Sequence, residues 1–267
     1  MKSLILWMLF AFFGIVFVAT WIMEGHCMSK KMSYMPTPAA NLCLTSTPKR
    51  ILEPWIRQNI LDMQRLDGHQ GVVLSLPRIF AKTGEPYVVP EELRRADQVR
   101  ILECEDEGPG TKLLAPLRDS SIPEDRILVF CDDDMSYKQQ TFLHLVRAIA
   151  EESTAVHTLC TRKVSGYIGF GAYKSTLRPI LQTPMPAACR TVDDDYFTTL
   201  LKALGIPLRC VVLPNCSSIC QACAYDMPTA VTRMFGDNES LMYKEMLTSS
   251  KRANAIKECV AAVQKIH

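Results

Sequence analysis

Three consecutive aspartates, Asp132, Asp133 and Asp134, follow the apolar run ILVFC at residues 127–131. If that run is a buried strand, the acids stand where it leaves a sheet, and adjacent negative charges there repel one another. Side chains alternate along an extended backbone, so Asp132 and Asp134 point to the same side. Mg²⁺ and Mn²⁺ prefer a few carboxylates together with phosphate oxygens. The spacing therefore predicts that Asp132 and Asp134 bind Mg²⁺ or Mn²⁺ and, through it, a diphosphate.

The same acids have a second interpretation. Aspartate-rich turns are common, and the side chains would then be solvated and cap a helix that starts near Ser136. The position of the acids directly after a buried strand favours the metal site over this alternative.

A second acidic cluster, Asp193 to Asp195, follows the residues CRTV and opens a predicted helix. Thr191 and Asp194 have the spacing of a capping box, although the usual partner of the threonine is Glu or Gln. Acids in a first helical turn also interact favourably with the helix dipole. A structural role for this cluster is therefore expected beside any chemical one.

The elements that position these clusters alternate along the chain, as the hydrophobic periodicity indicates. This alternation predicts an α/β layer fold with a mostly parallel sheet flanked by helices, and ligands bind such sheets beyond the carboxyl ends of the strands. The acids after residue 131 fall at that edge. The expected strands are 41–47, 71–77, 98–105, 125–131, 155–161 and 206–214, and the expected helices are 50–66, 137–153, 193–204 and 251–265.

Residues 3–23 carry no charge, and a helix of that length matches the thickness of a bilayer's hydrocarbon core. A cleaved signal peptide is the alternative, but its apolar core would be expected to span only about 7–15 residues. We therefore expect a transmembrane signal anchor at 1–23, a stem at 24–40 and one catalytic domain at 41–267. Lysines are too evenly placed on the two sides to fix the orientation.

The charges nearly cancel, with 30 Lys and Arg against 28 Asp and Glu, which excludes a broad basic field for nucleic acid. Eleven cysteines are many for a reducing compartment and fit better a lumen where some of them pair, and Asn215 and Asn238 begin glycosylation sequons. Together with an anchor, these features predict a single-pass type II membrane protein of the Golgi or endoplasmic reticulum with a luminal catalytic domain.

The chain also resembles a poorly characterised group of membrane-anchored glycosyltransferases with the GT-A fold, similar to glycosyltransferase family 2. The resemblance rests on six strings in a shared order, which cover most of residues 41–214. These strings are TSTPKRI (45–51), VVLSLPR (72–78), GPGTK (108–112), VFCDDDMSY (129–137), GFGAY (169–173) and VDDDYFTTLLKALGIPL (192–208).

The resemblance implies a donor site around the first strand and the metal strand. Thr45 and Arg50 correspond to part of the nucleotide pocket, and Asp132 and Asp134 to the Asp-x-Asp motif that holds the divalent cation and the nucleotide-sugar diphosphate. Asp133 is expected to face the ribose or solvent. GPGTK resembles the loop before the metal strand; its glycines allow backbone N–H groups to approach a phosphate while Lys112 supplies charge. An ordinary turn with a solvated lysine is the alternative.

Two further roles follow from the resemblance. GFGAY is similar to the loop beneath the donor sugar, where Gly169 and Gly171 make room, although a plain flexible turn is the alternative. An acid in the second cluster faces the acceptor as general base, for which we choose Asp194, with Asp195 second. The implied activity transfers a sugar from a UDP- or GDP-sugar to a hydroxyl of a glycan, protein or lipid, and a carboxylate base implies inversion at the anomeric carbon.

Three other interpretations compete. A haloacid-dehalogenase-like phosphotransferase would use Asp132 as nucleophile and Asp134 as acid or base, but three strands precede the motif here. Cys216, Cys220 and Cys223 have the spacing of an iron–sulfur site, although a disulfide or inert thiols fit their late position better. The third interpretation is a transferase-like domain that binds its ligand without catalysing a reaction.

Overall fold

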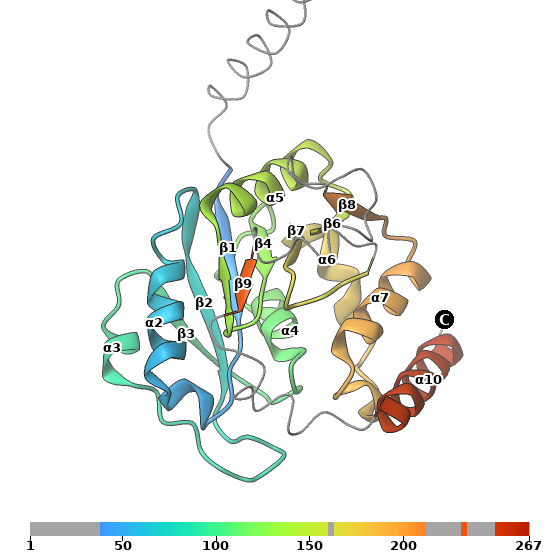
Figure 1. The fold of residues 1–267 in the computed structure, drawn as a ribbon. Coiled ribbons are helices and arrows are strands. Elements are labelled where there is room, and N and C mark those ends of the chain that lie inside the picture. Colours follow the sequence, from blue (N-terminus) through green and yellow to red (C-terminus); the bar gives the residue numbers. More distant parts are fainter. Residues whose placement is uncertain (1–37, 160–162, 212–230, 234–248, 267) are drawn as a thin grey trace, which may run out of the picture. The chain divides into compact units, whose positions relative to one another are not determined.

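Seven strands form one sheet in the order β3-β2-β1-β4-β7-β6-β8 (Figure 1). The computed structural model describes residues 38–159, 163–211, 231–233 and 249–266. Neighbouring strands are parallel except where β7 pairs with β4 and β6, which confirms the predicted mostly parallel sheet. The strands are β1 (Ala40–Leu44), β2 (His69–Pro77), β3 (Val99–Cys104), β4 (Ile127–Phe130), β6 (Val156–Leu159), β7 (Phe170–Tyr173) and β8 (Leu208–Val211).

Helices cover both faces of the sheet, because alternate strand residues point to opposite sides and both sets are apolar. Leu42 and Leu44 of β1 belong to a core shared with α2 and α5, whereas Cys43 belongs to a second core shared with α4, α7 and α10. The helices are α2 (Pro54–Met63), α3 (Glu91–Arg94), α4 (Thr111–Arg118), α5 (Gln139–Glu151), α6 (Lys174–Leu177), α7 (Asp193–Ala203) and α10 (Ser249–Ile266), with 3₁₀ turns η1 (Arg50–Leu52), η2 (Arg178–Gln182) and η3 (Ala187–Cys189).

The order of the strands reverses between β1 and β4. The chain passes from β1 outward to β2 and β3, and then returns to place β4 on the other side of β1. In open α/β sheets, ligands bind at the carboxyl ends of the strands that flank such a switch point. Thr45 and Ser46 follow β1 there, and the aspartates follow β4. The topology therefore brings the acids to the position where a ligand site is expected.

Two elements next to the acids differ from the sequence-based expectation. Residues Met135–Tyr137 form a short strand, β5, which pairs antiparallel with β9 (Val231–Arg233), so the following helix starts later than expected. The loop expected at GPGTK ends at Gly110, because α4 begins at Thr111. Lys112 consequently stands in the first turn of a helix that the periodicity did not reveal.

The GFGAY string forms strand β7, so the expectation of a loop there is wrong. A Cβ atom on Gly171 would come within 2.6 Å of the Leu128 carbonyl oxygen on β4, which explains the glycine by close strand contact. Gly169 precedes the strand with φ of +100°, a conformation that other residues rarely adopt. The glycines here serve strand packing and a turn, whereas the sequence was interpreted as a loop that makes room for a donor sugar.

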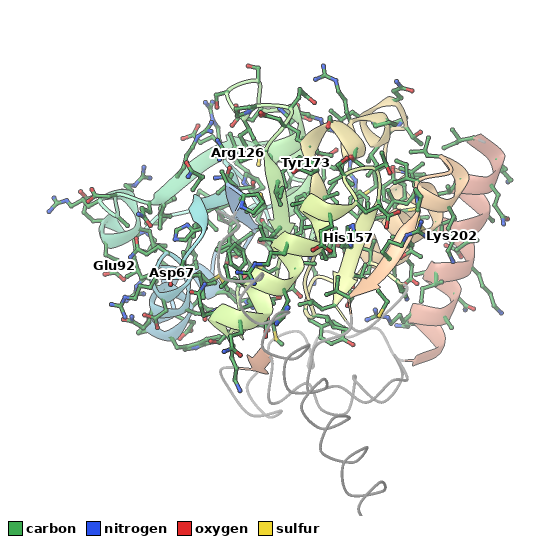
Figure 2. The ribbon with its side chains drawn as sticks, turned by 90° about the horizontal axis from the view of Figure 1, so that it is seen from above. Asp67, Glu92, Arg126, His157, Tyr173 and Lys202 are labelled. Carbon is green, nitrogen blue, oxygen red and sulfur yellow. A yellow bond between two sulfur atoms is a disulfide. The ribbon has the colours of Figure 1, made fainter. Side chains whose placement is uncertain are left out.

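The last described helix is attached covalently to the segment that enters α7. Cys189 in η3 and Cys259 in α10 form a disulfide with their Cα atoms 4.8 Å apart. In Figure 2, α10 lies beside α7, which carries Lys202, at one side of the sheet. Asp67 and Glu92 lie at the opposite side. The disulfide agrees with the expectation that some of the cysteines pair.

No helix in the described ranges combines the length and the apolar character that a bilayer span requires. The predicted anchor at 1–23 and most of the stem at 24–40 lie outside the described residues, as do both sequons and Cys216, Cys220 and Cys223.

Candidate active site

Arg50 joins two of the three aspartates that follow β4. Its guanidinium forms an ion pair with Asp133, and its Nη2 lies 3.2 Å from Oδ2 of Asp134. Burial alone would lower the pKa of Arg50, but Asp133 and then Asp134 outweigh that effect and raise it. The guanidinium is therefore charged, and it compensates part of the repulsion between adjacent acids.

Asp133 is buried and does not face solvent, which corrects one of the two expectations for its side chain. It is 3% exposed and accepts a hydrogen bond of 2.5 Å from Ser46 Oγ besides its contact with Arg50. Burial raises the pKa of Asp133 to about 6, against the lowering influence of Arg50. The Asn59 side chain donates to the Asp133 carbonyl oxygen at 2.7 Å and so fixes the backbone of the acidic turn.

Lys112 connects the two acidic clusters. Its Nζ lies 2.8 Å from Oδ1 of Asp132 and 3.3 Å from Oδ2 of Asp193, although its side chain is only 4% exposed. Burial alone would lower the pKa of Lys112, and Asp132 together with Asp193 raises it well above its usual value. The buried ammonium is therefore charged, and it brings the end of β4 within reach of the start of α7.

Gly166 stands between the same clusters and was not identified from the sequence. Its N–H donates to Oδ1 of Asp194 at 3.1 Å, and its carbonyl oxygen accepts from the Asp132 N–H at 3.2 Å and the Tyr137 hydroxyl at 3.1 Å. A Cβ atom here would collide with Lys112 Nζ and lie 2.5 Å from Asp132 Oδ1. The Ser-Gly dipeptide in a glycine-rich stretch was the only signal in the sequence.

Asp194 has the environment expected of a general base. Burial and the neighbouring Asp193 raise the pKa of Asp194 to about 7, while Lys112 acts in the opposite direction. A carboxylate with a pKa near neutrality can accept a proton in the working pH range. Asp195, the second choice, is buried and its Oδ1 lies 2.5 Å from Lys163 Nζ, so it is less suited to this role.

The capping box expected from Thr191 and Asp194 is not formed. The N-cap residue of α7 is Val192, and no side chain caps it. Thr198 instead donates to the Asp194 carbonyl oxygen at 2.7 Å. The carboxylate of Asp194 accepts from the amide of Gly166, toward the first acidic cluster, and does not cap the helix.

The donor set suits a hard divalent cation in chemical type and in charge. Arg50 and Lys112 provide two positive charges against five carboxylates, those of Asp132, Asp133, Asp134, Asp193 and Asp194. No described group of three His, Cys, Asp or Glu side chains is arranged as a metal cage. Two carboxylates that share a cation with a diphosphate need no such cage. In charge and in ligand type, Asp132 and Asp134 are therefore compatible with a cation that is shared with a diphosphate.

The remaining predicted residues lie around this cluster in different ways. Thr45 Oγ1 donates to the Ser75 carbonyl oxygen at 2.8 Å and so ties the end of β1 to β2. Gly171 lies inside the sheet, and its position gives no support to the expected contact with a donor sugar. Gly169 lies under Tyr137, with the ring Cε1 3.0 Å from the Cβ position. Arg50, Lys112 and the acids therefore lie together in the structure, whereas Gly169 and Gly171 have structural roles in a turn and a strand.

Two hollows in the described part of the chain lie away from the acids. One is at the amino ends of the strands, beside Asn41, Gly71, Val99 and Arg126, and the other is beside His157 and Arg209. At the acidic site, Arg50 and Lys112 form ion pairs with the carboxylates.

Comparisons with known proteins identify no family. No protein-family model matches the chain, and no curated protein matches it. The chain is similar to a solved CMP:2-keto-3-deoxy-manno-octonic acid synthetase complexed with CTP, at 12% identity over 72% of this chain and 97% of that chain, with a TM-score of 0.47.

Two other solved structures are similar at the same level. One is the mannosyltransferase PcManGT from Pyrobaculum calidifontis in complex with GDP-Man and Mn²⁺, at 16% identity over 73% of this chain and 65% of that chain, with a TM-score of 0.45. The other is the 2-C-methyl-D-erythritol 4-phosphate cytidylyltransferase from Francisella tularensis, at 10% identity over 67% and 91%, with a TM-score of 0.44. All three use or bind nucleotides, and likenesses this distant identify neither family nor substrate.

Proposed function

We propose that this protein is a glycosyltransferase that moves a sugar from a UDP- or GDP-sugar to a hydroxyl of a glycan, protein or lipid. One observation carries the proposal. The acids after β4 and the acids that open α7 meet across Lys112 and Gly166, at the switch point of the sheet. A donor-binding cluster and a base are both required for sugar transfer, and this arrangement brings them together.

In the proposed reaction, Asp194 accepts the proton of the acceptor hydroxyl. The hydroxyl oxygen then bonds to the anomeric carbon while the bond from that carbon to the diphosphate oxygen breaks, and the electron pair leaves with the nucleoside diphosphate. A single displacement of this kind inverts the anomeric centre. When Mg²⁺ or Mn²⁺ is bound by Asp132 and Asp134, it neutralises charge that develops on the departing phosphate.

The environments of the acids support this division of roles. Asp194 is buried beside Asp193, which raises its pKa to about 7 and suits a base. Asp134 lies against Arg50, with Oδ2 3.2 Å from Nη2, and serves in this proposal as a metal ligand. The Cys189–Cys259 disulfide supports the proposed luminal setting, because disulfides persist in oxidising compartments. The type II topology with an anchor at 1–23 remains part of the proposal.

The decisive experiment measures the thermal stability of the full-length chain with UDP- and GDP-sugars in the presence and absence of Mn²⁺. We expect a nucleotide-sugar to raise Tm when Mn²⁺ is present, since a ligand that binds only the folded state stabilises it. Asp134→Asn should abolish the rise. Asp125→Asn is the matched control, because Asp125 is exposed at the opposite end of β4. Indifference to every nucleotide-sugar would refute the proposal.

A domain that binds without turnover is the second candidate. It is favoured by one observation, that Asp132 and Asp134 already have positive partners in the chain and so do not require a metal for their own stability. Detection of the free nucleoside diphosphate from a nucleotide-sugar that binds separates the two candidates. Binding without release, with several acceptor hydroxyls tried, would favour the binding module.

A further inference from the structure

The two buried cations of the site contact the same carboxylates that are proposed to hold the metal. Lys112 Nζ lies 2.8 Å from Oδ1 of Asp132, and Arg50 Nη2 lies 3.2 Å from Oδ2 of Asp134. Each cation also has a second carboxylate, Asp193 for Lys112 and Asp133 for Arg50. Both cations are therefore anchored by one acid while they contact one proposed metal ligand.

This arrangement places the protein's own charges in competition with a divalent cation. A metal ion that approaches Asp132 and Asp134 meets carboxylates that are already paired, and it is repelled by the two nearby positive charges. A nucleoside diphosphate alone meets the opposite difficulty, because the acids of the cluster outnumber the bases. Metal and diphosphate together relieve both difficulties, since the phosphate oxygens offer Lys112 and Arg50 a new negative partner.

We propose that Lys112 and Arg50 are exchangeable counter-ions, which hold Asp132 and Asp134 until a divalent cation and a nucleoside diphosphate enter together. The two side chains then exchange their contacts with Asp132 and Asp134 for phosphate oxygens, and no covalent bond changes. This inference rests on the proposed function for the identity of the anion. Its consequence is that metal and nucleotide bind cooperatively, each raising the affinity for the other.

The surroundings of Lys112 permit such an exchange. Gly166 leaves the space beside Lys112 Nζ free of a side chain, and Asp132 remains 21% exposed, the most open of the paired acids here. Asp193, whose Oδ2 lies 3.3 Å from Lys112 Nζ in the structure, can anchor the ammonium when its contact with Asp132 is given up. The lysine can therefore change partners by a small movement and keep a compensated charge.

The test is a titration of the full-length chain with MnCl₂ alone, in which free Mn²⁺ is followed by its electron paramagnetic resonance signal. Lys112→Met should raise the affinity for Mn²⁺ by at least about tenfold, because it removes a positive charge adjacent to the ligand. Lys112→Arg keeps the positive charge, so its affinity for Mn²⁺ should stay close to that of the parent protein. An affinity that is unchanged or lower in Lys112→Met overturns the inference.

Lys174→Met is the matched control for loss of a buried lysine. Lys174 is 2% exposed and donates to the carbonyl oxygens of Asp119 and Ile122 at 2.7 and 2.8 Å, away from the acids. Its removal should lower stability and leave Mn²⁺ affinity unchanged. If Lys112→Met does not fold, Arg50→Gln provides the equivalent test, because it removes the positive charge beside Asp134. An unchanged or lower affinity of Arg50→Gln for Mn²⁺ would again overturn the inference.

A second titration separates failure of this inference from failure of the proposed function. UDP and GDP are each titrated with and without saturating MnCl₂. For the nucleotide that binds, Mn²⁺ should increase the affinity of the parent protein for that nucleotide by at least about tenfold. The increase should be much smaller in Lys112→Met. Equal coupling in both proteins overturns the exchange while the transferase proposal stands. If neither nucleotide binds but Lys112→Met still gains affinity for Mn²⁺, the competition is supported and the transferase proposal fails.

Discussion

Lys112 and Asp132, which are twenty positions apart in the sequence, form a partly buried ion pair of 2.8 Å at the junction of the two acidic clusters. The aspartates after β4 were expected to need a positive charge from outside the chain. The structure shows that Lys112 and Arg50 supply part of it, and that acids still outnumber bases. The site is therefore organised before any ligand enters.

Gly166→Ala should disrupt the junction between the clusters. The new methyl group would collide with Lys112 Nζ and lie 2.5 Å from Asp132 Oδ1, and Lys112 is held in place by both Asp132 and Asp193. Overpacking of this kind costs about 1–3 kcal/mol of unfolding free energy, which urea denaturation measures.

The control for this substitution is Gly84→Ala. Gly84 has φ of +74° and nothing within 4 Å of its Cβ position, so that variant reports the cost of the backbone conformation alone. We expect Gly166→Ala to weaken nucleotide binding and Gly84→Ala to leave it unchanged. Equal nucleotide affinity in both variants would show that the space at Gly166 is not needed by the site.

The transfer activity should fall as pH decreases through about 7. A general base must be unprotonated, and burial together with Asp193 raises the pKa of Asp194 to about 7. Below that value kcat/KM should decrease about tenfold per pH unit, as expected for one essential proton. Asp194→Asn should remove most activity at every pH. A pH profile that is flat between pH 5 and 7 would contradict the role of Asp194.

The same carboxyl group should make stability depend on pH. Its folded-state pKa of about 7 lies above the unfolded value of 3.8, so the folded state binds more protons between these values. The free energy of unfolding therefore falls as pH rises from about 4 to 7. Asp194→Asn should flatten this dependence, whereas Asp125→Asn should not. The slope is measured by urea unfolding at several pH values, and an unchanged slope in Asp194→Asn would refute the assignment.

Tyr137→Phe should destabilise the turn that contains Gly166. The Tyr137 hydroxyl donates to the Gly166 carbonyl oxygen at 3.1 Å, and loss of such a bond costs about 1 kcal/mol. Tyr173→Phe is the control, because no described residue hydrogen-bonds that hydroxyl in the structure. Thermal unfolding compares the two variants, and an equal Tm would indicate that the bond to Gly166 contributes nothing.

Loss of the disulfide should lower stability by about 4 kcal/mol, the chain-entropy value for a loop that closes over 70 positions. The double variant Cys189→Ala, Cys259→Ala is compared with the parent by urea unfolding, with and without a reductant. Reductant should destabilise the parent and leave the double variant unchanged. A parent protein that is insensitive to reduction would show that the bond does not form in solution.

The sheet was largely predictable, because its strands are apolar runs bounded by turn residues. β3, β4, β6 and β8 fall within the expected ranges, and β1 and β2 begin one and two residues before theirs. The physical reason is that a strand buried on both faces is apolar throughout. Such a strand is visible in the sequence as an uninterrupted apolar run. The position of the acids followed from the position of β4.

Features set by close contacts between distant residues were not predictable. β7 was missed because Gly171 resembles a loop residue until its contact with Leu128 is known. Helix α4 was missed because its start follows two glycines and a proline. The ion pairs of Lys112 and Arg50 depend on how four separate segments pack together, and no local sequence pattern specifies that packing. The role of Gly166 was not predictable for the same reason, because it depends on Lys112 and Asp132, which lie beside it only in the folded chain.

The bond between Cys189 and Cys259 has a consequence for the intact molecule beyond its energy. Because it links positions on either side of residues 190–258, a protease that cuts once anywhere in that interval leaves both fragments joined. The nicked chain would keep its C-terminal helix and migrate as one species until a thiol separates the fragments. Processing within that interval would therefore be invisible in gels run without reductant.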